Sequence, residues 1–223
     1  MADYDGDGLA DLTSGCSCCD QAFGFFLFRR QKDGSFAAKQ RIELDYPKDK
    51  FEKLGEFPPK GLQAMVAVTD WNGDGVPDLL VGGNTRVLGV AYGPLAGKKT
   101  VTVERVWPKG KELLRGMTTN LCVADWDRDG LADLIVGGYV GEKRGVYWLR
   151  NVGTRREPKL VEPKSLNIDD EALLFTTGVW VADWNADGRP DLIVSRQAWY
   201  RVGLGASYGV RQHKVWVYLR QPR

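Results

Sequence analysis

The 223-residue sequence is poor in the groups that most often carry catalysis and transition-metal chemistry. It contains one histidine, His213, so a His-based triad or a His-rich metal site is a poor expectation. It lacks a G-x-x-x-x-G-K-[ST] phosphate loop, and no apolar run approaches the roughly 18 residues of a membrane span. Its net charge of +2 creates no strong field for nucleic acid or an anionic membrane. We therefore expect no enzyme activity, no nucleic-acid partner and no membrane insertion.

Cysteine is scarce and irregularly placed. Cys16, Cys18 and Cys19 crowd together, whereas Cys122 lies far along the chain. This is neither a disulfide framework nor a zinc spacing, so the cysteines do not define the compartment. Packing of small residues is the preferred interpretation of the cluster; a local disulfide involving Cys16 or Cys122, or a metal or redox site, are the alternatives. We expect Cys122 itself to be a buried apolar residue of a strand.

What the sequence does contain is an internal repeat. Four ten-residue segments share the pattern D-aromatic-[DN]-x-D-G-x-[AP]-D-L, and they start 67, 55 and 58 residues apart. They read DYDGDGLADL (3–12), DWNGDGVPDL (70–79), DWDRDGLADL (125–134) and DWNADGRPDL (183–192). Five such constrained positions match by chance roughly once in a million positions, given average residue usage. The four copies therefore define the organisation of the chain.

Short runs rich in β-branched and aromatic residues surround each copy, and no segment has a sustained helical period. The runs lie before the motif (65–69, 121–124, 179–182), directly after it (79–83, 134–138, 192–195), further on (25–28, 146–149, 215–219) and, more weakly, at 101–106. Each repeat is thus predicted to form four antiparallel strands. One such sheet cannot bury both faces alone, and sheets of this kind stack radially as propeller blades.

The predicted fold is all-β: one propeller domain of about four repeats, in which the blades span 1–60, 61–115, 116–175 and 176–223. The first motif begins at residue 3, so blade 1 lacks its first strand, and blade 4 lacks its last. For the same reason, the absence of a basic and apolar signal peptide at the start is only weak evidence against secretion. We prefer a partial propeller whose remaining blades belong to a longer parent chain, with a closed four-bladed ring as the alternative. A β-sandwich would not require one loop chemistry at blade spacing.

The repeated loop has the chemistry of a site for a hard cation. Carboxylates or amides occupy loop positions 1, 3, 5 and 9, glycine at position 6 permits a sharp turn, and the carbonyl of position 7 can add an oxygen. Bare carboxylates this close repel one another, and the loops carry no Cys or His, which favours Ca²⁺, up to four ions, over zinc. An EF-hand or dockerin loop is disfavoured because strands follow these loops. The predicted ligands are Asp3, Asp5, Asp7, Leu9, Asp11; Asp70, Asn72, Asp74, Val76, Asp78; Asp125, Asp127, Asp129, Leu131, Asp133; and Asp183, Asn185, Asp187, Arg189, Asp191.

These loops, together with the Leu-Ile-Val-Gly-Gly runs behind them, resemble the FG-GAP/VCBS repeat family, which includes the calcium-binding blades of integrin α-subunit propellers. The resemblance covers nearly the whole chain. It implies calcium between the first and second strand of each blade, an extracellular or periplasmic location, and binding of a protein or carbohydrate ligand, as in adhesion. Some members accompany polysaccharide-active enzymes, so a lectin-like module, or a lyase that uses Lys, Arg or Tyr with calcium, is the alternative function.

Two further sets of residues are predicted to have distinct roles. The segment 197–213 is expected to be a long linker, and its Trp199, Tyr200, Tyr208 and Arg211 are candidates for a ligand platform. The alternative is that these side chains only cover the blade. The motif aromatics recur at one repeat position, so we expect them to pack between neighbouring blades; they are Tyr4, Trp71, Trp126 and Trp184.

Overall fold

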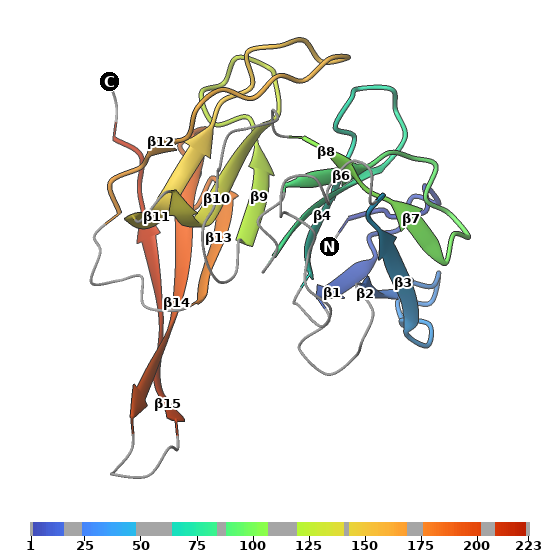
Figure 1. Ribbon diagram of the computed structural model, residues 1–223, viewed down its shortest axis with the longest axis horizontal. Coiled ribbons are helices and arrows are strands. Elements are labelled where there is room, and N and C mark those ends of the chain that lie inside the picture. Colours follow the sequence, from blue (N-terminus) through green and yellow to red (C-terminus); the bar gives the residue numbers. More distant parts are fainter. Residues whose placement is uncertain are drawn as a thin grey trace.

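The computed structural model describes residues 2–15, 24–47, 64–83, 88–106, 120–140, 143–168, 176–201 and 208–221. Every regular element in these ranges is a β-strand, and the strands form four small sheets arranged as a four-bladed β-propeller (Figure 1). The predicted all-β propeller is therefore confirmed. No helix in the described part of the chain has the length and apolar character needed to cross a membrane.

The sheets follow the order of the repeats along the chain. Sheet 1 has the order β1-β2-β3-β7, sheet 2 β4-β5-β6-β8, sheet 3 β12-β11-β10-β9 and sheet 4 β13-β14-β15. The bounds are β1 Leu12–Gly15, β2 Gly24–Phe28, β3 Gln40–Asp45, β4 Ala64–Thr69, β5 Asp78–Gly83, β6 Gly89–Ala91, β7 Thr100–Thr102, β8 Glu104–Arg105, β9 Asn120–Ala124, β10 Asp133–Val140, β11 Lys143–Leu149, β12 Lys164–Ser165, β13 Thr176–Ala182, β14 Asp191–Arg201 and β15 Tyr208–Tyr218.

The predicted single strand at 101–106 is divided between two sheets. Residues 100–102 form β7, which pairs in parallel with β3 and so joins sheet 1, whereas β8 pairs antiparallel with β6 in sheet 2. Val101 and Val103 are both buried in the apolar cluster between these sheets. The chain therefore crosses from one blade to the next within four residues, and this crossing links the two blades by backbone hydrogen bonds as well as by packing.

In sheets 2, 3 and 4 the strand that follows the acidic loop is an inner strand of its blade, whereas β1 is an edge strand of sheet 1. In β5, Leu79 contacts the cluster shared with sheet 1, and Leu80 contacts the cluster shared with sheet 3. Both faces of the strand are thus covered, which explains why the sequence here is a continuous apolar run rather than an alternating one. The equivalent residues Leu134 and Ile135 of β10 divide in the same way between the clusters on the two sides of sheet 3.

Three apolar clusters hold consecutive sheets together, one each between sheets 1 and 2, 2 and 3, and 3 and 4. Tyr4, Trp71 and Trp126 each belong to one of them, so the predicted packing between blades is confirmed for these three residues. The prediction is wrong for Trp184, whose side chain is 63% exposed. Trp126 is covered by sheet 4, but among the described residues no further sheet follows to cover Trp184.

The prediction that residues 197–213 form a long linker is also wrong. Residues 197–201 extend β14 and residues 208–213 belong to β15, so most of the segment is a long two-stranded hairpin with one register shift at Ala198 and Trp199. The hairpin projects well away from the rest of its sheet (Figure 1). Trp199, Tyr200 and Val210 are residue types that favour strands, and the pairing of β14 with β15 continues through them despite the glycines in this segment.

Candidate metal centre

The four acidic loops have the same backbone conformation, which is fixed by their own side chains. The position-1 carboxylate accepts hydrogen bonds from the N–H groups of positions 5 and 6; in the third loop, Asp125 accepts from Asp129 (3.0 Å) and Gly130 (2.9 Å). The position-5 carboxylate accepts from the N–H of position 7, as Asp129 does from Leu131 at 3.0 Å. The position-6 glycine has a φ between +78° and +89° in every loop, as its predicted role in a sharp turn requires.

The position-9 aspartates are the buried polar groups that anchor the loops to the sheets. Asp11, Asp78, Asp133 and Asp191 are each at most 1% exposed. Oδ2 of Asp78 accepts from the N–H of Trp71 (2.9 Å), and Oδ1 accepts from the N–H of Gly93 (2.9 Å), at the end of the third strand. The same two hydrogen bonds recur in the other three blades. This carboxylate therefore fastens the loop to the neighbouring strand end.

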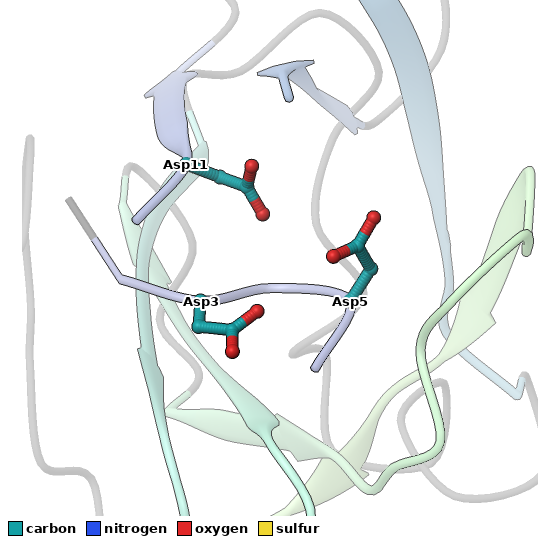
Figure 2. Close-up of side chains that lie close together, drawn as sticks. All are labelled: Asp3, Asp5 and Asp11. Carbon is teal, nitrogen blue, oxygen red and sulfur yellow. The ribbon is translucent and has the colours of Figure 1, made fainter. Parts of the chain in front are cut away.

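In loops 1 and 3 the structure brings three predicted ligands together. Carboxylate oxygens of Asp3, Asp5 and Asp11 lie within 4.8 Å of one another, and those of Asp125, Asp127 and Asp133 do the same. Figure 2 shows how the first three side chains gather around one space. The position-5 residues Asp7 and Asp129 are not part of these groups, and Asp129 instead forms an ion pair with Arg150 at 3.0 Å.

Each of these two groups contains a buried carboxylate oxygen that accepts no hydrogen bond. These atoms are Oδ1 of Asp5 and Oδ1 of Asp127, both at loop position 3. Burial, followed by the charges of Asp7 and Asp11, raises the pKa of Asp5. Burial is also the main cause that raises the pKa of Asp133. A buried anionic oxygen without a donor is costly unless a cation satisfies it, so these residues fit a hard divalent ion.

Loops 2 and 4 differ because position 3 is an amide. Asn72 donates from Nδ2 to Asp74 Oδ2 (3.0 Å), and its Oδ1 accepts from the N–H of Asp74 (3.1 Å). Asn185 makes the same pair of contacts with Asp187, at 3.1 and 3.2 Å. The position-3 oxygens of these loops are thus satisfied internally, and each loop carries one carboxylate fewer.

The remaining predicted ligands are the position-7 carbonyls of Leu9, Val76, Leu131 and Arg189. Their N–H groups donate to the position-5 carboxylates at 2.8–3.0 Å, which places their backbone within the loop. Position 4 was left unassigned by the motif, yet it too has a positive φ: +79° at Gly6, +65° at Gly73, +66° at Arg128 and +57° at Ala186. The residues at this position differ too much for the sequence to reveal the constraint.

A cleft of about 220 Å³ lies beside loops 3 and 4, and sequence reasoning missed it. It is lined by Asp127, Arg128, Arg189, Arg220 and Gln221. Arg220 is held in place because its guanidinium lies 5.0 Å from the Trp126 ring centroid and donates to the Trp126 carbonyl. Arg128 and Arg189 form no ion pair with any residue that the structure describes. The arginines come from three separate segments, so only the packing of blades 3 and 4 gathers them.

The other predicted sites are placed only in part. Trp199, Tyr200, Tyr208 and Arg211 lie on the β14–β15 hairpin, where Trp199 pairs with Val210 and Tyr200 with Gly209, but their side chains lie outside the described residues. Cys16, Cys18 and Cys19 also lie outside them. Cys122 is a free thiol in β9, partly buried against sheet 4, and burial raises its pKa.

The blades and loops together define a β-propeller in which a repeated acidic turn joins the first and second strands of the blade. The family model for the FG-GAP-like repeat matches residues 3–81 and 125–194, which together span two thirds of the sequence. The chain therefore belongs to the FG-GAP repeat family of β-propellers. Among curated proteins, none matches the chain.

Proposed function

We propose that the chain is a non-enzymatic binding module whose propeller is stabilised by structural calcium. The observation that carries this proposal is the pair of buried, donor-free oxygens on Asp5 and Asp127, each within a group of three converging carboxylates. Three carboxylates within 4.8 Å repel one another, and a divalent ion converts that repulsion into attraction.

Calcium suits these loops better than the other common ions. All candidate donors are oxygens, which disfavours zinc. Calcium accepts six to eight oxygens in irregular arrangements, whereas magnesium requires a near-ideal octahedron, so these loops favour calcium. Loops 1 and 3 are proposed as the tighter sites because ligand charge tunes calcium affinity. Loops 2 and 4, with an amide at position 3, are proposed to bind more weakly.

The test is thermal unfolding in excess calcium, in excess magnesium and in chelator, because an ion that binds only the folded state stabilises it by mass action. Calcium is expected to raise the unfolding midpoint well above the value in chelator, and magnesium much less. Asp127→Asn gives loop 3 the donor set of loop 2 and is expected to reduce the calcium-dependent rise. Asp129→Ala should likewise act mainly in calcium and little in chelator.

The matched control is Asp33→Asn, which removes the same charge from an exposed turn outside the loops, where Asp33 accepts from Ser35. It is expected to leave the calcium-dependent rise unchanged. Equal losses for Asp127→Asn in calcium and in chelator would contradict the ligand assignment. An unfolding midpoint that does not respond to calcium would contradict the proposed cofactor.

The proposed setting is extracellular or periplasmic, and the proposed role is adhesion or binding of a protein ligand. Calcium sites of extracellular modules have dissociation constants of about 10⁻⁴ to 10⁻³ M, so they fill where calcium is abundant. A propeller held rigid by such ions presents its loops as a fixed surface for a partner. Secretion of the full-length protein in its host, followed by fractionation, tests this location.

The second candidate function, carbohydrate binding, is favoured by the arginine-lined cleft beside loops 3 and 4. Guanidinium groups form bidentate hydrogen bonds with carboxylates and sulfates, so acidic polysaccharides are the class of sugar that this cleft would bind. Arg128→Ala is expected to weaken binding of polygalacturonate or a sulfated glycan, measured by calorimetry, while Arg156→Ala on another exposed turn serves as the control. Equal binding by both variants would remove this candidate.

A further inference from the structure

The arginine-lined cleft is held in place by hydrogen bonds to two neighbouring acidic loops. Arg220, which follows β15, makes both of these connections. Its backbone N–H donates to Oδ1 of Asp191 at position 9 of loop 4 (2.8 Å), and its guanidinium donates to the carbonyl of Trp126 in loop 3. The cleft therefore has a fixed position relative to the candidate metal ligands of both loops.

The two loop arginines of the cleft depart from the repeat. Arg128 occupies position 4 of loop 3, where the other three loops have glycine or alanine, and Arg189 occupies position 7 of loop 4, where the others have leucine or valine. The backbone of Arg128 has a φ of +66°, which glycine adopts more readily than arginine. The conformation of the loop does not require either cationic side chain, and neither forms an ion pair within the described part of the chain. Both are therefore available to an anionic ligand.

Asp127 belongs to the cleft and to the acidic group of loop 3 at the same time. Its side chain lines the cleft, and one of its carboxylate oxygens lies within 4.8 Å of oxygens of Asp125 and Asp133. The side chain is only 13% exposed, and its buried Oδ1 accepts no hydrogen bond from the described residues. One carboxylate is thus shared by a candidate cation site and a cleft that suits anions.

The charge of loop 3 opposes the binding of an anion in this cleft. The loop has four carboxylates, and Arg150 pairs with those of Asp127 and Asp129, so these five side chains together carry three net negative charges. A calcium ion held by the loop would offset two of them. The electrostatic cost of placing an anion against Arg128, the residue next to Asp127, is then lower.

We propose that calcium in loop 3 and an acidic saccharide in the arginine-lined cleft bind cooperatively, because both interact with the charge of Asp127. This inference rests on the proposed calcium site and on the cleft proposed for carbohydrate. The saccharide carries sulfate or carboxylate groups, since guanidinium groups pair with these anions in bidentate geometry. Coupling between two binding sites is reciprocal, so the saccharide raises the affinity of loop 3 for calcium by the same factor.

The test is a calorimetric titration of the full chain with a sulfated disaccharide, in saturating calcium and in chelator at equal ionic strength. A short probe carries too few charges to sequester the calcium, and titration of calcium into the probe alone measures any remaining association. Calcium is expected to tighten disaccharide binding at least about 5-fold, which is the lower end of typical coupling between sites. Equal ionic strength is needed because salt screens the same charges.

Asp127→Asn removes the shared charge, and loop 2 already has an asparagine at this position in the same loop conformation. The variant is expected to bind the disaccharide more tightly than wild type in chelator and to lose most of the response to calcium. Asp5→Asn makes the same change in loop 1, which does not line the cleft, and is the matched control. It is expected to keep the wild-type disaccharide affinity in both conditions.

Thermal unfolding of the same samples reports calcium binding independently of the disaccharide. A midpoint that rises in calcium while disaccharide affinity stays constant would overturn the coupling and leave the calcium site standing. A midpoint that does not respond to calcium would contradict the calcium site, and the coupling with it. Absence of disaccharide binding in both conditions, or an Asp127→Asn variant that behaves like Asp5→Asn, would also overturn the coupling.

Discussion

Arg150 lies across the third acidic loop, with Nε 2.6 Å from Asp127 Oδ2 and Nη2 3.0 Å from Asp129 Oδ2. The corresponding residue in blade 1 is Arg29, whose Nη1 lies 3.9 Å from Asp5 Oδ2. In blades 2 and 4 this position is Tyr92 and Leu219, and there the loop has asparagine at position 3. An arginine therefore accompanies each loop that has a third converging carboxylate, which indicates that it offsets the charge of these loops.

Arg150→Gln is expected to raise the calcium affinity of loop 3, because a fixed positive charge beside Asp127 repels a second cation. In chelator the same change is expected to lower the free energy of unfolding only slightly, since the Arg150 side chain is solvent-exposed. Calorimetric titration with calcium and unfolding in chelator measure the two effects. Arg29→Gln should give a smaller gain in affinity, because its ion pair is longer. Lower calcium affinity after Arg150→Gln would contradict this competition.

Asp78→Asn is expected to destabilise the protein in calcium and in chelator alike. Both carboxylate oxygens of Asp78 accept backbone hydrogen bonds, so an amide would place an N–H₂ group against a backbone N–H donor. The expected loss is about 2 to 3 kcal/mol, measured by denaturant unfolding. Asp74→Asn, on an exposed residue of the same loop, is the matched comparison and should act mainly in calcium. A loss for Asp78→Asn that vanishes in chelator would show that its role is metal binding alone.

Trp71→Ala and Trp184→Ala change the same repeat position but are expected to differ strongly. Trp71 is 3% exposed and packs between sheets 2 and 3, so its removal should cost about 3 to 5 kcal/mol. Trp184 is exposed, so its removal should change the free energy of unfolding by less than about 0.5 kcal/mol in dilute protein. Denaturant unfolding compares the two variants. Similar losses in both variants would mean that Trp184 is buried in the folded chain.

The Cys122 thiol is expected to react slowly with iodoacetamide in the folded protein. Burial raises its pKa above the ordinary value of 9.0, so the reactive thiolate is scarcer at mildly alkaline pH than in the unfolded chain. Because the folded pKa is raised, the stability that the protonated thiol contributes is present below pH 9 and is lost as pH rises through the raised pKa. Mass spectrometry of the peptide that contains Cys122, with and without denaturant, measures the rate. Equal rates in both conditions would contradict the burial of this thiol.

The sequence alone determined the class of fold and the composition of the loops. The spacing of the four motifs and the apolar runs after them predicted an all-β propeller, because a strand buried on both faces must be a continuous apolar run, as Leu79 and Leu80 show. The turn at Gly130 was equally predictable, since only glycine readily adopts the φ of +89° found there. These features depend on local periodicity and local backbone geometry, which can be predicted from the order of the residues.

Only the tertiary structure decided which side chains meet. The division of 100–106 between β7 and β8 depends on a parallel pairing with a strand more than fifty residues earlier, and no local pattern records such a pairing. The same holds for Arg150 beside Asp127, for the cleft of three arginines, and for the exposure of Trp184, whose motif position is identical to that of the buried Trp71. Burial at a repeated position depends on whether another sheet follows, and that is a property of the assembled blades rather than of the motif.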